Sequence, residues 1–112
     1  MNKETQEKIN QLSMLEQNMQ NFASQKQQFQ AQLMEAESAE KELENSRDAY
    51  KIIGNIMVAR DKSRAKDELK EKQTLLKKRI DAFEKQESKL RERAEALQKE
   101  VLEEMKKADK KK

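Results

Sequence analysis

The feature that most constrains this chain is a short apolar segment at its middle, residues 51–59, which holds the only glycine of the 112 residues. The segment gathers Ile, Met and Val without charged residues between them. Gly54-Asn55 is a two-residue turn signal, because both residues accept positive φ. β-Branched side chains on either side favour strands over helix. Residues 49–60 are therefore predicted to form a β-hairpin.

A two-residue turn fixes the pairing of this hairpin: Ile53 with Ile56, Ile52 with Met57, Lys51 with Val58, and Tyr50 with Ala59. Both faces are then largely apolar, and a lone two-stranded hairpin is marginal in water. We expect the hairpin to be buried against strands of other subunits, because the chain has no other strand. The expected oligomerisation residues are Tyr50, Ile52, Ile53, Gly54, Asn55, Ile56, Met57 and Val58. A hairpin that merely caps the helices would leave its apolar faces unexplained.

The segments on either side read as long helices. The chain is 42% charged and 34% hydrophobic, with no proline, and such a composition does not enclose a globular core. The apolar residues nevertheless recur with the 3–4 spacing of a coiled coil. In 1–48 the spacing selects Leu12, Leu15, Met19, Phe22, Lys26, Phe29, Leu33, Ala36, Glu40 and Leu43. In 61–112 it selects Leu69, Gln73, Leu76, Ile80, Phe83, Glu87, Leu90, Ala94, Leu97 and Val101.

These twenty residues, here called the seam, predict one all-α dominated subunit. It is a long antiparallel two-helix coiled coil with one central hairpin. Residues 1–48 carry 5 basic and 9 acidic side chains and residues 61–112 carry 18 and 13, so opposite net charges favour pairing. Folding about Gly54-Asn55 places Leu12 near Val101, Met19 near Ala94 and Leu33 near Ile80. It also sets Lys26 opposite Glu87 and Glu40 opposite Gln73, polar pairs that can fix the register. A snorkelling Lys26, with its charge in water, is an equal alternative.

Several functions are excluded by residue types that the chain lacks. It has no cysteine and no histidine, so thiolate metal sites and the common nucleophile–base pairs are missing. One glycine does not make a phosphate-binding loop. We therefore expect neither an enzyme nor a cofactor. No apolar stretch approaches the ~20 residues of a membrane span, and no signal-peptide pattern follows Met1, so the expected location is the cytoplasm, without a membrane partner.

The pattern of two helices around one hairpin resembles the β-type subunit of prefoldin, a hexameric co-chaperone. The likeness rests on Tyr50-Lys51-x-x-Gly54-Asn55-x-x-Val58 and on Lys66-Asp67-Glu68-Leu69 entering the second helix. Ala49 departs from the family, which commonly has a larger aliphatic residue before the tyrosine. The resemblance implies that the hairpin joins an oligomeric β-barrel, built with α-type subunits and further copies of this chain as a hetero-hexamer. It also implies that the coil tips hold unfolded client proteins and pass them to a group II chaperonin, without ATP.

The free ends of the helices carry the candidate client-binding residues. Apolar side chains collect there, and methionine suits surfaces that fit many partners. The proposed tip residues are Ile9, Leu12, Met14, Val101, Leu102 and Met105, with Met1 and Leu97 nearby. Scattered exposed apolar residues are also ordinary on protein surfaces. The basic run Lys106, Lys107, Lys110, Lys111 and Lys112 is either a solvated tail or an electrostatic contact to an acidic chaperonin surface.

Two other functions stay open on the sequence. A structural coiled-coil spacer needs no client surface at all. A nucleic-acid-binding coil would use the basic second helix. Acidic residues interleaved with the basic ones argue against nucleic acid, as does the absence of exposed aromatic residues for stacking on that helix.

Overall fold

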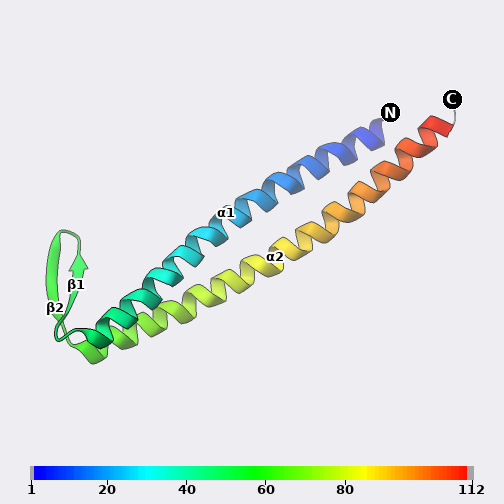
Figure 1. The fold of residues 1–112 in the computed structure, drawn as a ribbon. Coiled ribbons are helices and arrows are strands. Elements are labelled where there is room, and N and C mark those ends of the chain that lie inside the picture. The colour runs from blue at the N-terminus through cyan, green and yellow to red at the C-terminus, as the bar shows by residue number, and fades with distance from the viewer. Residues whose placement is uncertain (1, 111–112) are drawn as a thin grey trace. The chain divides into compact units, whose positions relative to one another are not determined.

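The computed structural model describes residues 2–110 (Figure 1). Helix α1 spans Lys3–Asn45, strand β1 Ala49–Ile53, strand β2 Ile56–Arg60 and helix α2 Lys62–Lys110. The two strands form one antiparallel sheet, the only sheet among the described residues. The predicted fold class, two long helices with a central hairpin, is confirmed.

The hairpin has the register that its turn residues predict. Ile53 pairs with Ile56, Ile52 with Met57, Lys51 with Val58 and Tyr50 with Ala59. Gly54 adopts φ of 61°, in the left-handed region that a residue with a Cβ rarely occupies. A two-residue turn of this kind matches the twist of the flanking strands, so it closes the hairpin without splaying them.

The seam residues account for the burial along both helices. From Leu12 to Leu43 and from Leu69 to Val101, every seam position is buried or half-buried, and every residue between these positions is exposed. The most enclosed apolar side chains are Leu15, Ala36, Leu76, Ala94 and Val101. A stripe this narrow is the contact surface of a two-stranded coil rather than of a globular bundle.

The chain divides into two compact units, each with one segment of α1 and one of α2. The first consists of Met1–Lys26 and Ala82–Lys112, and the second is Gln27–Asp81, which includes the hairpin. In the first unit the rings of Phe22 and Phe83 lie 5.5 Å apart. In the second, the Arg79 guanidinium lies 5.6 Å from the centre of the Phe29 ring. The helical segments run antiparallel within each unit, and the two chain ends belong to the first (Figure 1).

Polar residues close the helix ends. The Asn2 side-chain oxygen accepts the Thr5 backbone N–H at 2.8 Å, an N-cap for α1. Helix α1 ends at Asn45, in the polar run Asn45-Ser46-Arg47-Asp48, and the Lys62 ammonium donates to the carbonyls of Glu44 and Ser46 there. Because α2 begins at Lys62, Asp61 occupies its N-cap position.

Candidate interaction surfaces

The hairpin presents a large exposed apolar surface in the second unit. Tyr50, Ile52, Ile53, Ile56 and Met57 are each more than half exposed, and Val58 is 38% exposed. Exposed apolar residues are ordinary one at a time, but a contiguous patch of this kind marks an interaction site. Most of the apolar hairpin residues predicted for oligomerisation are thus exposed to solvent in the single chain. Their role in assembly stays a prediction.

The two faces of the hairpin differ at its base. Lys51 and Arg60 lie on one face, and both form ion pairs with Glu68 of α2. The hydrogen bond from Arg60 is the main cause that holds the pKa of Glu68 below its ordinary value, and Lys51 adds to it. The other face carries Tyr50, Ile52, Met57 and Ala59, all exposed. The face with Lys51 and Arg60 is therefore joined to α2 by ion pairs at its base. The other face, here called the open face, is exposed to solvent.

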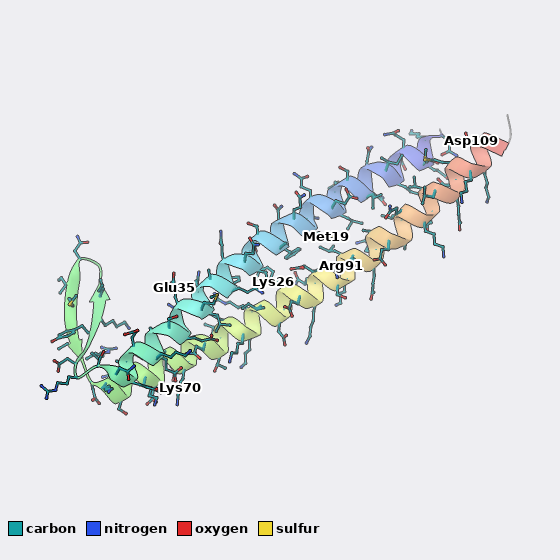
Figure 2. All side chains as sticks on the ribbon, viewed as in Figure 1. Met19, Lys26, Glu35, Lys70, Arg91 and Asp109 are labelled. Carbon is teal, nitrogen blue, oxygen red and sulfur yellow. The ribbon has the colours of Figure 1, made fainter. Side chains whose placement is uncertain are left out.

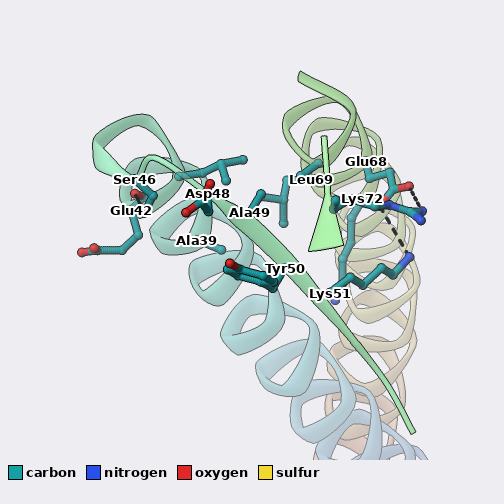
Figure 3. A pocket seen from close by; sticks show the side chains of 13 residues that line it. Ala39, Glu42, Ser46, Asp48, Ala49, Tyr50, Lys51, Glu68, Leu69 and Lys72 are labelled. Atoms are coloured by element: carbon teal, nitrogen blue, oxygen red, sulfur yellow. Dashed lines mark hydrogen bonds and ion pairs between the residues drawn. The ribbon is translucent and has the colours of Figure 1, made fainter. Parts of the chain in front are cut away.

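A groove of about 570 Å³ lies at the hairpin base, between the strands and the adjoining turns of both helices (Figure 3). Its apolar lining includes Ala39, Leu43, Ala49 and Leu69, and charged side chains, among them Glu68 and Lys72, line the remainder. Ala49 is buried there. It stands where the resemblance leads one to expect a larger aliphatic residue, and it is one of the residues that line the groove.

The polar seam residues meet in the pairs that the sequence suggested. The Lys26 ammonium lies 3.3 Å from Glu87, whose side chain is 11% exposed, and the Gln73 amide donates to Glu40 at 2.7 Å. Lys26 lies between the helices in Figure 2, whereas the exposed Glu35 points away from them. The snorkelling alternative for Lys26 does not describe this geometry. That these pairs fix the register is still a hypothesis.

One apolar contact departs from the register expected from folding about Gly54-Asn55. Phe22 packs against Phe83, where that register would place Leu90. Gln73 also reaches the backbone carbonyl of Ala36, one turn from Glu40. Side chains of an antiparallel coil interlock diagonally as well as directly across the seam, so the register estimated from the centre of the turn is only approximate.

The proposed client-binding residues lie in the first unit, on the terminal turns of α1 and α2. Met14, Leu102 and Met105 are exposed, by 65%, 53% and 42%. Ile9 and Leu12 are half-buried and Val101 is buried. The six residues therefore form two groups, one open to solvent and one covered by the paired helices. Met1, Lys111 and Lys112 lie outside the described residues.

Sequence reasoning missed a polar cluster beside these residues, made of Thr5, Lys8 and Glu104 and here called the clasp. The Thr5 hydroxyl donates to one carboxylate oxygen of Glu104 at 2.6 Å, and the Lys8 ammonium contacts the other. Thr5 is only 3% exposed. The Lys8 and Thr5 hydrogen bonds hold the pKa of Glu104 below its ordinary value, and the Glu104 carboxylate raises the pKa of Lys8. The 3–4 spacing reaches these residues when it is continued past Leu12 and Val101.

A metal site and a membrane-spanning helix are both absent from the part of the chain that the structure describes. Across residues 2–110, no three Asp or Glu side chains come together as a metal site. Neither helix holds, over its described length, an apolar stretch sufficient for a membrane crossing. Lys106 and Lys107 are exposed on the last turns of α2. Lys110 is its last residue.

The fold and these surfaces define a class of protein: a coiled-coil subunit whose exposed apolar hairpin fits it for assembly with other subunits. Comparison with known proteins makes the class specific. The family model "Prefoldin subunit" matches residues 6–108, and the chain belongs to this family. The family consists of non-enzymatic chaperone subunits that work in complexes with other prefoldin subunits.

The relatives narrow the likeness to one subunit type. Prefoldin subunit beta of Thermococcus onnurineus is 38% identical over 97 residues, 84% of each chain. That of Pyrobaculum islandicum is 35% identical over 103 residues, covering 89% of this chain and 82% of its own. The crystal structure of the prefoldin beta subunit from Thermococcus strain KS-1 superposes with a TM-score of 0.84 at 35% identity, over 89% of this chain and 90% of that one. This confirms the likeness to the β-type subunit and supports a co-chaperone role.

Proposed function

We propose that this chain is a subunit of an ATP-independent holdase in the cytoplasm, which binds unfolded or nascent proteins and delivers them to a group II chaperonin. The observation that carries the proposal is the exposed hairpin, with five apolar side chains each more than half in solvent. Burying one such side chain contributes roughly 1.5–3 kcal/mol, so assembly through hairpins is strongly favoured. The partners are α-type prefoldin subunits and further copies of this chain, joined in a hetero-hexamer around a β-barrel.

The client surface in this proposal is the set of tip residues on the terminal turns of α1 and α2. Met14, Leu102 and Met105 are exposed and offer flexible apolar contacts to unfolded chains. Weak, adaptable contacts suit a protein that must release its client again. The exposed Lys106 and Lys107 supply positive charge for an acidic surface on the chaperonin, a contact expected to weaken as salt rises.

The direct test removes residues 1–10 and 100–112 from the chain and co-expresses the product with an α-type partner. Because the hairpin is untouched, the truncated subunit should still assemble. It should lose the ability to suppress aggregation of a denatured enzyme without ATP. Full suppression by the truncated assembly would contradict the tip proposal. A spacer would suppress nothing even at full length, and a nucleic-acid binder would instead shift RNA or DNA with a steep salt dependence.

A further inference from the structure

The closed helix ends cover half of the proposed client surface. Val101 is buried and Ile9 and Leu12 are half-buried, whereas the other three tip residues are exposed. A client chain can therefore reach Val101, and the covered parts of Ile9 and Leu12, only when the terminal turns of α1 and α2 separate. What holds these turns together decides how much of the surface is available.

The clasp holds the terminal turns of α1 and α2 together. Both carboxylate oxygens of Glu104 are engaged from α1, one by the Thr5 hydroxyl at 2.6 Å and one by Lys8. Lys8 also lies 3.4 Å from Glu100, and Asn2 fixes the Thr5 backbone from the N-cap position. Lys8 precedes Ile9 directly, and Glu104 lies one turn beyond Val101. The clasp is therefore next to the covered residues on both helices.

The residues between the two helices change from mostly apolar to polar at the helix ends. Between Leu12 and Leu43, eight of the ten seam residues are apolar, whereas the same spacing continued outward meets Thr5 and Lys8 on α1 and Glu104 on α2. An apolar seam opens only by exposing its own side chains to water. A hydrogen-bonded ion pair near the surface opens at small cost, because water replaces its partners and salt screens its charges. The terminal turns of α1 and α2 are thus held together by polar contacts that cost less to break than the apolar contacts of the seam.

We propose that the clasp of Thr5, Lys8 and Glu104 gates client capture, by holding the helix ends closed over Ile9, Leu12 and Val101 until a client displaces it. This inference rests on the proposed function, since it concerns the same client surface. When only a fraction of molecules is open, the apparent dissociation constant is the intrinsic one divided by that fraction. Loosening the clasp therefore strengthens client binding, and fixing it closed weakens binding.

The first experiment uses the full chain assembled with an α-type partner, in the variants Thr5→Val and Glu104→Gln. Glu103→Gln is the matched control, because Glu103 is exposed and its loss changes the net charge equally. Amide hydrogen exchange in residues 6–12 should rise several-fold in the clasp variants, the effect of losing one hydrogen bond or ion pair near the surface. Their dissociation constant for a reduced, carboxymethylated client protein should fall several-fold. The control should match the unmodified assembly in both measurements.

The second experiment closes the gate covalently. The chain has no cysteine, so Thr5→Cys with Glu104→Cys creates the only thiol pair in it, and a short bis-maleimide crosslinker joins the helix ends. Client affinity should be lower after crosslinking than before it in the same variant. Equal affinity before and after, or faster exchange in Thr5→Val with unchanged client affinity, would overturn the gate. If the unmodified assembly binds no unfolded client at all, the proposed function fails, and the gate with it.

Discussion

Lys26 and Glu87 form a charged pair inside a mostly apolar seam. Their side chains are 22% and 11% exposed, so each depends on the other to offset the loss of water. Lys26→Met should lower the free energy of unfolding by about 2 kcal/mol, because it leaves the Glu87 carboxylate unpaired. The combined Lys26→Leu, Glu87→Leu variant should recover that loss, since an apolar pair of similar size avoids desolvation altogether.

Urea unfolding followed by circular dichroism measures these free energies, and Gln17→Met serves as a control on the exposed face of α1. If the pair also fixes the register, the double variant should be stable but misaligned, which engineered cross-links between the helices would detect. If the effects of Lys26→Leu and Glu87→Leu, each measured alone, add up to the effect of the double variant, Lys26 and Glu87 do not interact.

Glu68 gives the attachment of the hairpin a pH dependence. Its pKa in the folded chain is held below its ordinary value, mainly by the hydrogen bond from Arg60. A carboxyl of this kind contributes stability above its ordinary pKa of about 4.3, and the contribution is lost as the pH falls through the lowered value. Glu68→Gln should therefore lower the melting temperature at pH 7 and have little effect at the acid end of the titration.

Thermal unfolding between pH 7 and pH 3 tests this prediction. Glu71→Gln is the comparison, since it removes an exposed carboxylate from the same helix. If the melting temperatures of Glu68→Gln and of the unmodified chain fall in parallel as the pH is lowered, the ion pairs with Arg60 and Lys51 do not stabilise the hairpin base.

The hairpin depends on one backbone conformation, that of Gly54. Its φ of 61° is unfavourable for a residue with a Cβ, although a Cβ built there would meet no atom within 4 Å. Gly54→Ala should therefore destabilise the hairpin by about 1 kcal/mol through the backbone alone. Gly54→Asn should cost less, because asparagine tolerates the left-handed region.

Assembly with an α-type partner, titrated by subunit concentration, provides the measurement. The order Gly, Asn, Ala in decreasing assembly strength is the expected result. An alanine variant that assembles as well as the unmodified chain would show that the turn does not limit the hairpin.

The elements were predictable from the sequence where a local pattern determines them. Gly54-Asn55 determines the hairpin register, and the 3–4 spacing determines which helix residues are covered, as the burial of Leu15 and Leu76 shows. The clasp was not predictable in this way. Its members Thr5 and Glu104 are separated by almost the whole chain and are polar. A search for apolar residues at the 3–4 spacing therefore passes over them, although the spacing continued outward reaches both positions.

Two further features depend on detail that a pattern does not contain. The contact between Phe22 and Phe83 depends on which rotamers the rings adopt across the seam. The groove beside Ala49 is a space between elements. Its volume depends on how the surrounding side chains pack, not on the identity of any one residue. In both cases the sequence identified the element but not the packing within it.

The coil buries its own apolar seam, whereas the hairpin leaves most of its apolar side chains exposed. Every seam residue finds cover within the chain, whereas the hairpin leaves Ile52 and Met57 exposed on its open face. This difference is the reason to expect stable assembly through the hairpin and weaker, reversible contacts elsewhere. It is also consistent with membership of a family whose subunits act in complexes.

The most direct test of this account is the native mass of the full chain at micromolar concentration, alone and with an α-type partner, compared with that of the Ile52→Glu, Met57→Lys variant. The account predicts that the unmodified chain assembles, as a hetero-hexamer when the partner is present, and that the variant stays a helical monomer under both conditions. An unmodified chain that stays a stable monomer with and without the partner, or a variant that assembles as well as the unmodified chain, would contradict it.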